Sequence, residues 1–158
     1  MQQITPFLWF DGCAEQARDF YLSIFKNSKV LKTSRYGDLG PGPKGTLMTT
    51  SFELNGQEFV ALNGGPEFKF TPALSLVVNC DTQAEIDYYW EKLLEGGTAS
   101  HCGWLYDKFG VSWQVVPRAL GEMLSDKDER RANRVVRALM EMIKLDLAVL
   151  ERAYDQPA

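Results

Sequence analysis

The stretch that decides the fold is residues 75–117, which reads SLVVNCD at 75–81, TQAEIDYYWEKLLEGG at 82–97 and CGWLYDKFGVSWQVVP at 102–117. The first piece is a short apolar run bounded by polar residues, as is typical of a buried strand. The second has apolar residues at helical spacing, Asp81 or Thr82 as its cap and a Gly-Gly pair at its end, so it predicts a helix with a defined start and stop. A strand over 99–106, the turn at 107–110 and a last strand over 111–116 follow. We expect one strand of this unit to be missing or compressed within residues 98–110.

A looser copy of this order precedes it. TPFLWFDG at 5–12 predicts a strand, and AEQARDFYLSIF at 14–25 predicts an amphipathic helix. Strand-like runs follow at 29–36, 46–54 and 57–63, the last two joined by the hairpin signal Asn55-Gly56. An internal repeat of this length indicates two related modules, about 4–65 and 73–118, within a domain spanning 1–118.

Residues 119–158 predict a C-terminal helical extension. Ser125-Asp126-Lys127-Asp128 resembles a capping box, and Asp146 can cap a final helix that runs to Tyr154. Between them, apolar residues from Val135 to Ile143 form a stripe. A helix with such a stripe is unstable alone, so the extension must pack on its own domain or on a second subunit.

Bulk composition excludes some classes of function. Of 158 residues, 45% are hydrophobic and 24% are charged, and the net charge is −4. This balance is ordinary for a soluble globular protein, and it disfavours binding to nucleic acid, which requires a basic surface. The apolar runs are too short to cross a bilayer, so we expect no membrane partner. Three widely spaced cysteines and no apparent signal peptide favour reduced thiols and a cytoplasmic location.

The segment DKFGVSWQ at 107–114 resembles the last repeat of the vicinal-oxygen-chelate superfamily, which includes glyoxalase I, bleomycin-resistance proteins and extradiol dioxygenases. The chain is most similar to the PhnB-like branch, whose members often carry the name 3-demethylubiquinone 3-methyltransferase. The pieces that carry this resemblance are TPFLWFDG at 5–12, LNGGPEFKFT at 62–71, CDTQAEIDYYWEKL at 80–93 and CGWLYDKFGVSWQVVP at 102–117. The resemblance implies an α+β fold of paired βαβββ modules, forming an open curved mixed sheet around a cavity. It also implies a homodimer.

Metal-using relatives place ligands at strand positions that correspond here to Thr5, Asn63, Ser75 and Gln114. Divalent cations prefer carboxylates or imidazoles, and these four side chains are neutral hydroxyls and amides. We therefore predict no catalytic metal and no other cofactor.

The same four residues can make a polar floor for a small-molecule site, with aromatic walls. The candidate lining residues are Thr5, Phe7, Trp9, Phe59, Asn63, Ser75, Cys102, Trp104, Trp113 and Gln114. About half of the strand residues must point away from any cavity, because side chains alternate along a strand. The Gly- and Pro-rich loop at 37–45 is either a mobile lid or an inert hairpin loop.

These observations favour a cytoplasmic, dimeric protein that binds a small organic molecule. A second interpretation is an isomerase, lyase or group-transfer enzyme in which Cys102, His101 or Gln114 acts on a small metabolite. The methyltransferase name meets an objection, because no glycine-rich turn of the kind that binds S-adenosylmethionine in a doubly wound domain is present. A third interpretation is an interaction role for the apolar stripe of the extension.

Overall fold

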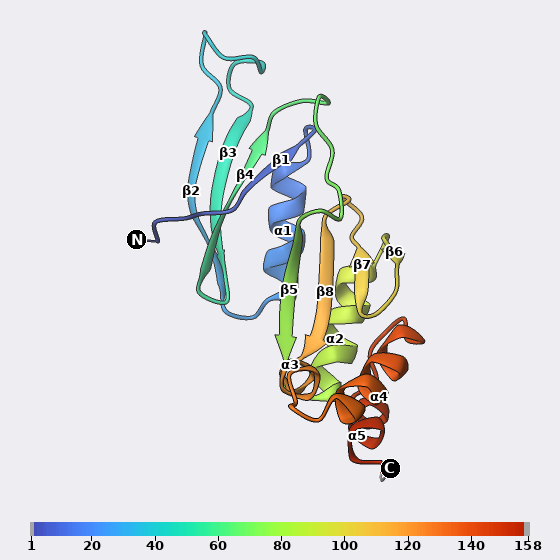
Figure 1. The fold of residues 1–158 in the computed structure, drawn as a ribbon. Helices are drawn as coiled ribbons and strands as arrows, with labels where there is room; N and C mark the ends of the chain where they lie inside the picture. The colour runs from blue at the N-terminus through green and yellow to red at the C-terminus, as the bar shows by residue number, and fades with distance from the viewer. Residues whose placement is uncertain (1, 157–158) are drawn as a thin grey trace. The chain divides into compact units, whose positions relative to one another are not determined.

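The computed structural model describes residues 2–156. The chain divides into two compact units, residues 1–70 and residues 71–158 (Figure 1). Both units repeat the order strand, helix, strand, strand, strand. The α+β class and the paired βαβββ modules are thus confirmed, with two open mixed sheets of four strands each.

The first unit is a mixed sheet with one helix. Its elements are β1 (Phe7–Phe10), α1 (Ala14–Ile24), β2 (Ser28–Arg35), β3 (Leu47–Leu54) and β4 (Gln57–Asn63). The strands lie in the order β1-β4-β3-β2, with β1 parallel to β4 and the other neighbours antiparallel. Asn55 and Gly56 both have positive φ, 49° and 86°, so the predicted tight turn joins β3 to β4.

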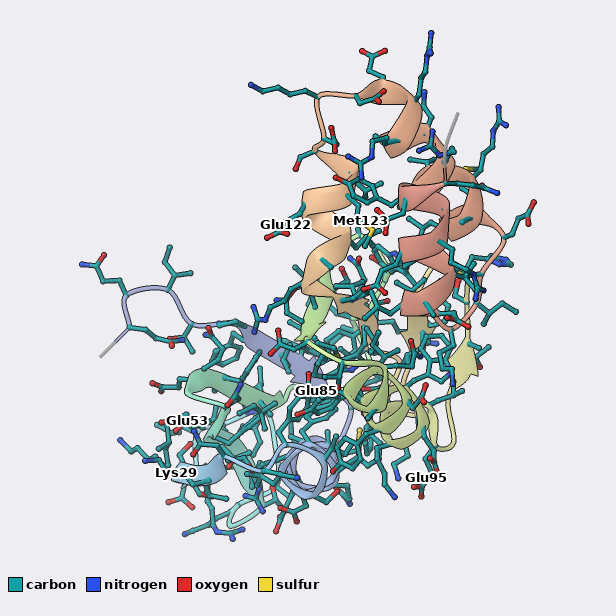
Figure 2. All side chains as sticks on the ribbon, turned by 90° about the horizontal axis from the view of Figure 1, so that it is seen from below. Lys29, Glu53, Glu85, Glu95, Glu122 and Met123 are labelled. Atoms are coloured by element: carbon teal, nitrogen blue, oxygen red, sulfur yellow. The ribbon has the colours of Figure 1, made fainter. Side chains whose placement is uncertain are left out.

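One face of this sheet is covered by α1. Tyr21 of α1 is stacked on Phe52 of β3 with ring centroids 6.4 Å apart, and Phe52 is stacked on Phe59 of β4 at 5.7 Å. All three rings are buried, and burial of such a side chain contributes about 1.5–3 kcal/mol. Because side chains alternate along a strand, the intervening residues form an open second face. Lys29 Nζ of β2 lies 3.9 Å from Glu53 Oε2 of the paired strand β3. Figure 2 labels both residues.

The second unit has the same plan followed by three helices. Its elements are β5 (Ser75–Cys80), α2 (Gln83–Leu94), β6 (Thr98–Ala99), β7 (Trp104–Tyr106), β8 (Ser112–Pro117), α3 (Arg118–Leu124), α4 (Glu129–Met140) and α5 (Leu147–Asp155). The strand order is β5-β8-β7-β6, with β5 parallel to β8. The expectation of one strand over 99–106 is wrong: a turn divides this segment into β6 and β7, and β6 is the compressed strand.

Side chains cap the starts of three helices of this unit, and α4 begins after Asp128 instead of after Ser125, the first residue of the predicted capping box. The Thr82 side chain accepts a hydrogen bond from Glu85 N, and Asp128 and Asp146 accept hydrogen bonds from Arg130 N and Val149 N. Each cap of this kind typically stabilises a helix by about 1 kcal/mol.

The helical extension belongs to the second unit. Leu120 and Met123 of α3 form a buried cluster with Val135, Leu145 and Leu150. Figure 2 shows Met123 pointing toward the neighbouring helices and Glu122 pointing away from them. Val135, the first residue of the apolar stripe, is therefore buried within the second unit.

Two sets of hydrogen bonds attach the extension to the rest of the unit. Cys102 N and Gly103 N donate to Met142 O and Ile143 O, each at 2.8 Å. On α2, the Gln83 side chain donates to Leu145 O at 3.1 Å and accepts from Leu147 N at 2.8 Å. None of the helices described between residues 2 and 156 combines the length and the apolar character needed to cross a membrane.

Candidate functional site

The open face of the second sheet brings together two of the predicted site residues. In the parallel pairing of β5 with β8, Ser75 lies opposite Ser112 and Val77 lies opposite Gln114. The Gln114 side chain reaches across, and its Nε2 donates to Ser75 Oγ at 2.9 Å. Ser75 and Gln114, two of the four residues predicted to form a polar floor, are thus joined by a direct hydrogen bond. Their role in a ligand site stays a prediction.

Aromatic residues of β7 lie beside these polar groups. In the antiparallel pairing of β7 with β8, Trp104 lies opposite Gln114 and Tyr106 lies opposite Ser112. Directly paired residues project on the same side of a sheet, so Trp104 and Tyr106 share the open face with Gln114. Both are half-buried, as are Ser75 and Gln114. The face thus combines hydrogen-bonding groups with aromatic surface.

Ser112 is a member of this face that sequence reasoning missed. It is 1% exposed, and its hydroxyl is the one buried side-chain oxygen or nitrogen atom of residues 2–156 with no hydrogen-bond partner. The signal that could have revealed it is its position two residues before Gln114, because alternate residues of a strand share a face.

The face is electrically neutral. Its other strand positions are Val77 and Asn79 of β5, Val116 of β8 and Thr98 of β6, so none of the strand residues on this face is charged at neutral pH. A charged ligand placed here would lose hydration without a counter-charge to offset the loss.

Trp113 lies on the opposite side of the same sheet. It is 3% exposed, and its Nε1 donates to Asp107 Oδ2 at 2.9 Å. Asp107 is buried as well, and its Oδ1 accepts from Phe109 N at 2.8 Å and Val111 N at 3.0 Å. These hydrogen bonds compensate the buried carboxylate and fix the turn before β8. Trp113 is therefore placed in the core with Asp107, away from Gln114.

Cys102 lies in the turn before β7, in a left-handed conformation with φ of 59°. Its backbone N–H holds the extension, as described above, and neighbouring His101 is exposed. The Cys80 thiol is fully buried at the end of β5, and burial raises its pKa to about 11. A thiol with such a pKa is protonated at neutral pH and is a poor nucleophile.

In the first unit, Phe7 and Trp9 of β1 project from the face that α1 leaves open. Phe7 is 58% exposed. Trp9 donates from Nε1 to Gly65 O at 2.9 Å, and its ring meets Phe68 edge-on with centroids 4.9 Å apart. A Cβ atom on Gly64 would overlap the indole, so this glycine lets the 62–71 segment close over Trp9. Thr5 precedes β1, and its Oγ1 accepts a hydrogen bond from Gln2 at 3.3 Å.

Phe59 and Asn63 are on the helix side of this sheet. Phe59 belongs to the ring stack with Phe52, and Asn63 has both ends of its amide engaged. Asn63 Oδ1 accepts from Ala14 N at 2.8 Å, and its Nδ2 donates to Leu47 O at 3.2 Å. Asn63 therefore joins the start of α1 to β3, and the structure does not place it with Thr5 as a polar floor.

A pocket of about 380 Å³ lies in the first unit at the carboxyl ends of β1 and β4. It is bounded by Tyr36, Asp11 and Asn63 together with part of the 37–45 loop. Tyr36 is 6% exposed, and its hydroxyl donates to Asn63 O. Cβ atoms on Gly40 or Gly42 would overlap the Tyr36 ring, so the loop is packed against that ring. This packing favours the fixed-loop interpretation over the mobile lid.

The residues at the predicted metal positions do not fit a divalent cation. Asn63 uses its amide within the fold, and Ser75 and Gln114 supply neutral groups that bond to each other. Within the part of the chain that the structure describes, no three His, Cys, Asp or Glu side chains gather as a metal site would require.

Comparison with known proteins identifies the family. The family model described as 3-demethylubiquinone-9 3-methyltransferase matches residues 2–116. A solved structure of a Bacillus cereus PhnB protein that carries the same methyltransferase name is 44% identical, with a TM-score of 0.67, and the match covers 73% of this chain and 99% of that one. No curated protein matches the chain.

Two more distant structures share the fold. Protein PA1353 from Pseudomonas aeruginosa is 24% identical over 74% of this chain and 98% of its own, with a TM-score of 0.62. The fosfomycin resistance protein FosX from Listeria monocytogenes, solved with Mn(II) and sulfate, is 16% identical over 78% and 98%, with a TM-score of 0.57. The resemblance stated from the sequence is confirmed: the chain belongs to the 3-demethylubiquinone-9 3-methyltransferase family, the PhnB-like branch of the vicinal-oxygen-chelate superfamily.

Proposed function

We propose that the protein binds a small, uncharged organic molecule on the open face of the second sheet, without a catalytic metal. The observation that carries this proposal is the hydrogen bond between Gln114 and Ser75, which joins β8 to β5 beside Trp104 and Tyr106 of β7. A few oriented polar groups beside aromatic surface are typical of sites that bind small organic ligands.

The lining residues support an uncharged ligand in particular. Gln114 and Ser75 are neutral, and aromatic rings favour contact with planar apolar surface. The Cys80 thiol, with its raised pKa, does not supply a nucleophile.

Binding of bicyclic aromatic probes tests this proposal. We expect 1-indanone and indole to cause saturable shifts in the NMR signals of β7 and β8, and Gln114→Ala to weaken binding without lowering the urea midpoint. Gln57→Ala is the matched control, because it removes an exposed glutamine of the first unit. Probes that perturb only the first unit, or binding unchanged in Gln114→Ala, would count against the proposal.

The family description supports a second candidate, catalysis on a quinone-derived ring. Transfer of a methyl group needs a donor, and neither described unit has the doubly wound parallel sheet that binds nucleotide-containing donors at its first turn. Transfer of labelled methyl from S-adenosylmethionine to 4-methylcatechol is the direct assay. Turnover that Gln114→Ala abolishes would establish this second candidate in place of simple binding.

A further inference from the structure

The hydroxyl of Ser112 carries an unmet hydrogen-bonding capacity at the proposed site. It is covered from solvent, and within residues 2–156 it has no partner. Leaving a buried hydroxyl unpaired is unfavourable, so such a group requires an explanation in the function or the hydration of the protein. An alanine at this position would avoid the cost.

Ser75 supplies a second hydroxyl beside it. The two serines are directly paired across β5 and β8. Because Gln114 Nε2–H donates to Ser75 Oγ, the Ser75 hydroxyl hydrogen remains able to donate elsewhere. Gln114 therefore orients Ser75 as a donor.

The spacing of the strands suits one shared acceptor. Directly paired residues on neighbouring strands lie about 4.8 Å apart, the usual spacing between strands. Backbones at this spacing allow one acceptor oxygen, with its two lone pairs, to lie within hydrogen-bonding distance of both hydroxyls.

The surroundings select the kind of carbonyl compound. A carboxylate or phosphate would bring a full negative charge onto a face that has no cationic side chain among its described residues. Trp104 and Tyr106 favour a flat ring next to the carbonyl group.

We infer that Ser75 and Ser112 together donate hydrogen bonds to the carbonyl oxygen of a planar, uncharged ligand, with Gln114 acting as a positioning residue for Ser75. This inference rests on the proposed function, since it names the ligand class of the same site. Because Ser112 Oγ is covered in the free protein, a neighbouring side chain rotates aside when the ligand binds.

Three probes of similar size separate the possibilities: 1-indanone has a planar ring and a carbonyl, indane has the same skeleton without oxygen, and benzoate is charged. We expect 1-indanone to bind best in NMR titrations of the full chain. Ser112→Ala should weaken binding of 1-indanone roughly three- to tenfold and leave indane unchanged. The urea midpoint of free Ser112→Ala should equal or exceed that of wild type, because the variant removes an unpaired group. Ser100→Ala is the control serine within the same unit.

The possible outcomes separate the carbonyl inference from the proposed function on which it rests. Equal affinity for 1-indanone and indane would overturn the carbonyl inference and leave binding at this face intact. Preference for benzoate would overturn the uncharged class. A loss of stability in free Ser112→Ala would show that the hydroxyl serves the fold, which also overturns the inference. If none of the three probes shifts the NMR signals of β7 and β8, the proposed function itself is wrong.

Discussion

Gly103 lies where the turn before β7 packs against the C-terminal extension. It has φ of 84°, and its N–H donates to Ile143 O in the extension. A Cβ atom there would lie 2.9 Å from Val115 O and 3.0 Å from Leu145 Cγ. The position thus requires glycine for two separate reasons, backbone conformation and space.

Gly103→Ala should therefore destabilise the second unit more than a change of backbone conformation alone. Gly110→Ala is the matched control, because Gly110 has a similar φ of 88° but open space around its Cβ direction. The control should cost about 1–2 kcal/mol, the usual penalty for a non-glycine residue in this region. We expect a larger loss for Gly103→Ala in urea-dependent hydrogen exchange of the β7 and β8 amides. Equal losses of stability in the two variants would show that the extension shifts to make room for the added methyl group.

Single residues also show how far a sequence predicts a site. Ser75 and Gln114 could be placed together because each occupies a defined position in its module. Trp113 and Phe59 could not be assigned to a face with the same assurance, since an apolar residue in an apolar strand fits either side. Asn63 was missed as a helix partner because the hydrogen bond with Ala14 joins residues far apart in sequence.

At the scale of elements, α4 and α5 are joined by a compact polar cluster. The Arg131 guanidinium lies 3.8 Å from the centroid of the Tyr154 ring, and the Tyr154 hydroxyl donates to Asp126 Oδ2 at 2.5 Å. Arg134 donates to Ala153 O at 2.8 Å and Tyr154 O at 3.0 Å, which satisfies carbonyls at the end of α5. These contacts hold the end of α5 against the start of α4.

This cluster should make the stability of the extension depend on pH at both extremes. The hydrogen bond from Tyr154 lowers the pKa of Asp126 and raises that of Tyr154. The Asp126 contribution is complete above the unfolded value of about 3.9 and is lost as pH falls through the lower folded pKa. The Tyr154 contribution is complete below about 10 and is lost as pH rises through the higher folded pKa.

Tyr154→Phe removes the hydroxyl and retains a ring for Arg131. We expect the difference in urea midpoint between wild type and this variant to be constant from about pH 5 to pH 9 and to shrink beyond both limits. In an Asp126→Asn background, the acid limb should disappear. A difference that stays constant down to the acid transition would refute the assigned role of the pair.

The elements themselves were largely predictable. The starts of α2 and α5 followed from Thr82 and Asp146, whose side chains cap the helices locally, whereas α4 starts at the last residue of the predicted capping box, Asp128. Helix caps of this kind can be predicted from the sequence, because the capping side chain and the N–H group that it binds are only a few residues apart. The division of 99–106 into β6 and β7 was not readable, because it depends on Cys102 and Gly103 binding carbonyls about 40 residues further along the chain.

The whole molecule is longer than the fold that defines its family. The family model ends at residue 116, and the match to the Bacillus cereus structure covers 73% of this chain. The extension nevertheless contributes Val135, Leu145 and Leu150, all 0% exposed, to a cluster with Leu120 and Met123. The second unit thus has a larger core than its family model alone describes. The homodimer and the cytoplasmic location stay predictions.

A chain that ends after Leu124 tests whether the extension is integral to the second unit. Truncation uncovers Leu120 and Met123 and removes the carbonyls that Cys102 N and Gly103 N bind. Loss of a buried leucine side chain alone typically costs about 2–5 kcal/mol, so we expect the β7 and β8 amides to lose most of their protection from hydrogen exchange. Ile143→Ala is the control within the extension, because Ile143 is 52% exposed and its truncation should change stability by about 0.5 kcal/mol or less. If the truncated chain keeps wild-type protection, the rest of the second unit folds without α4 and α5, and the extension is not needed for its stability.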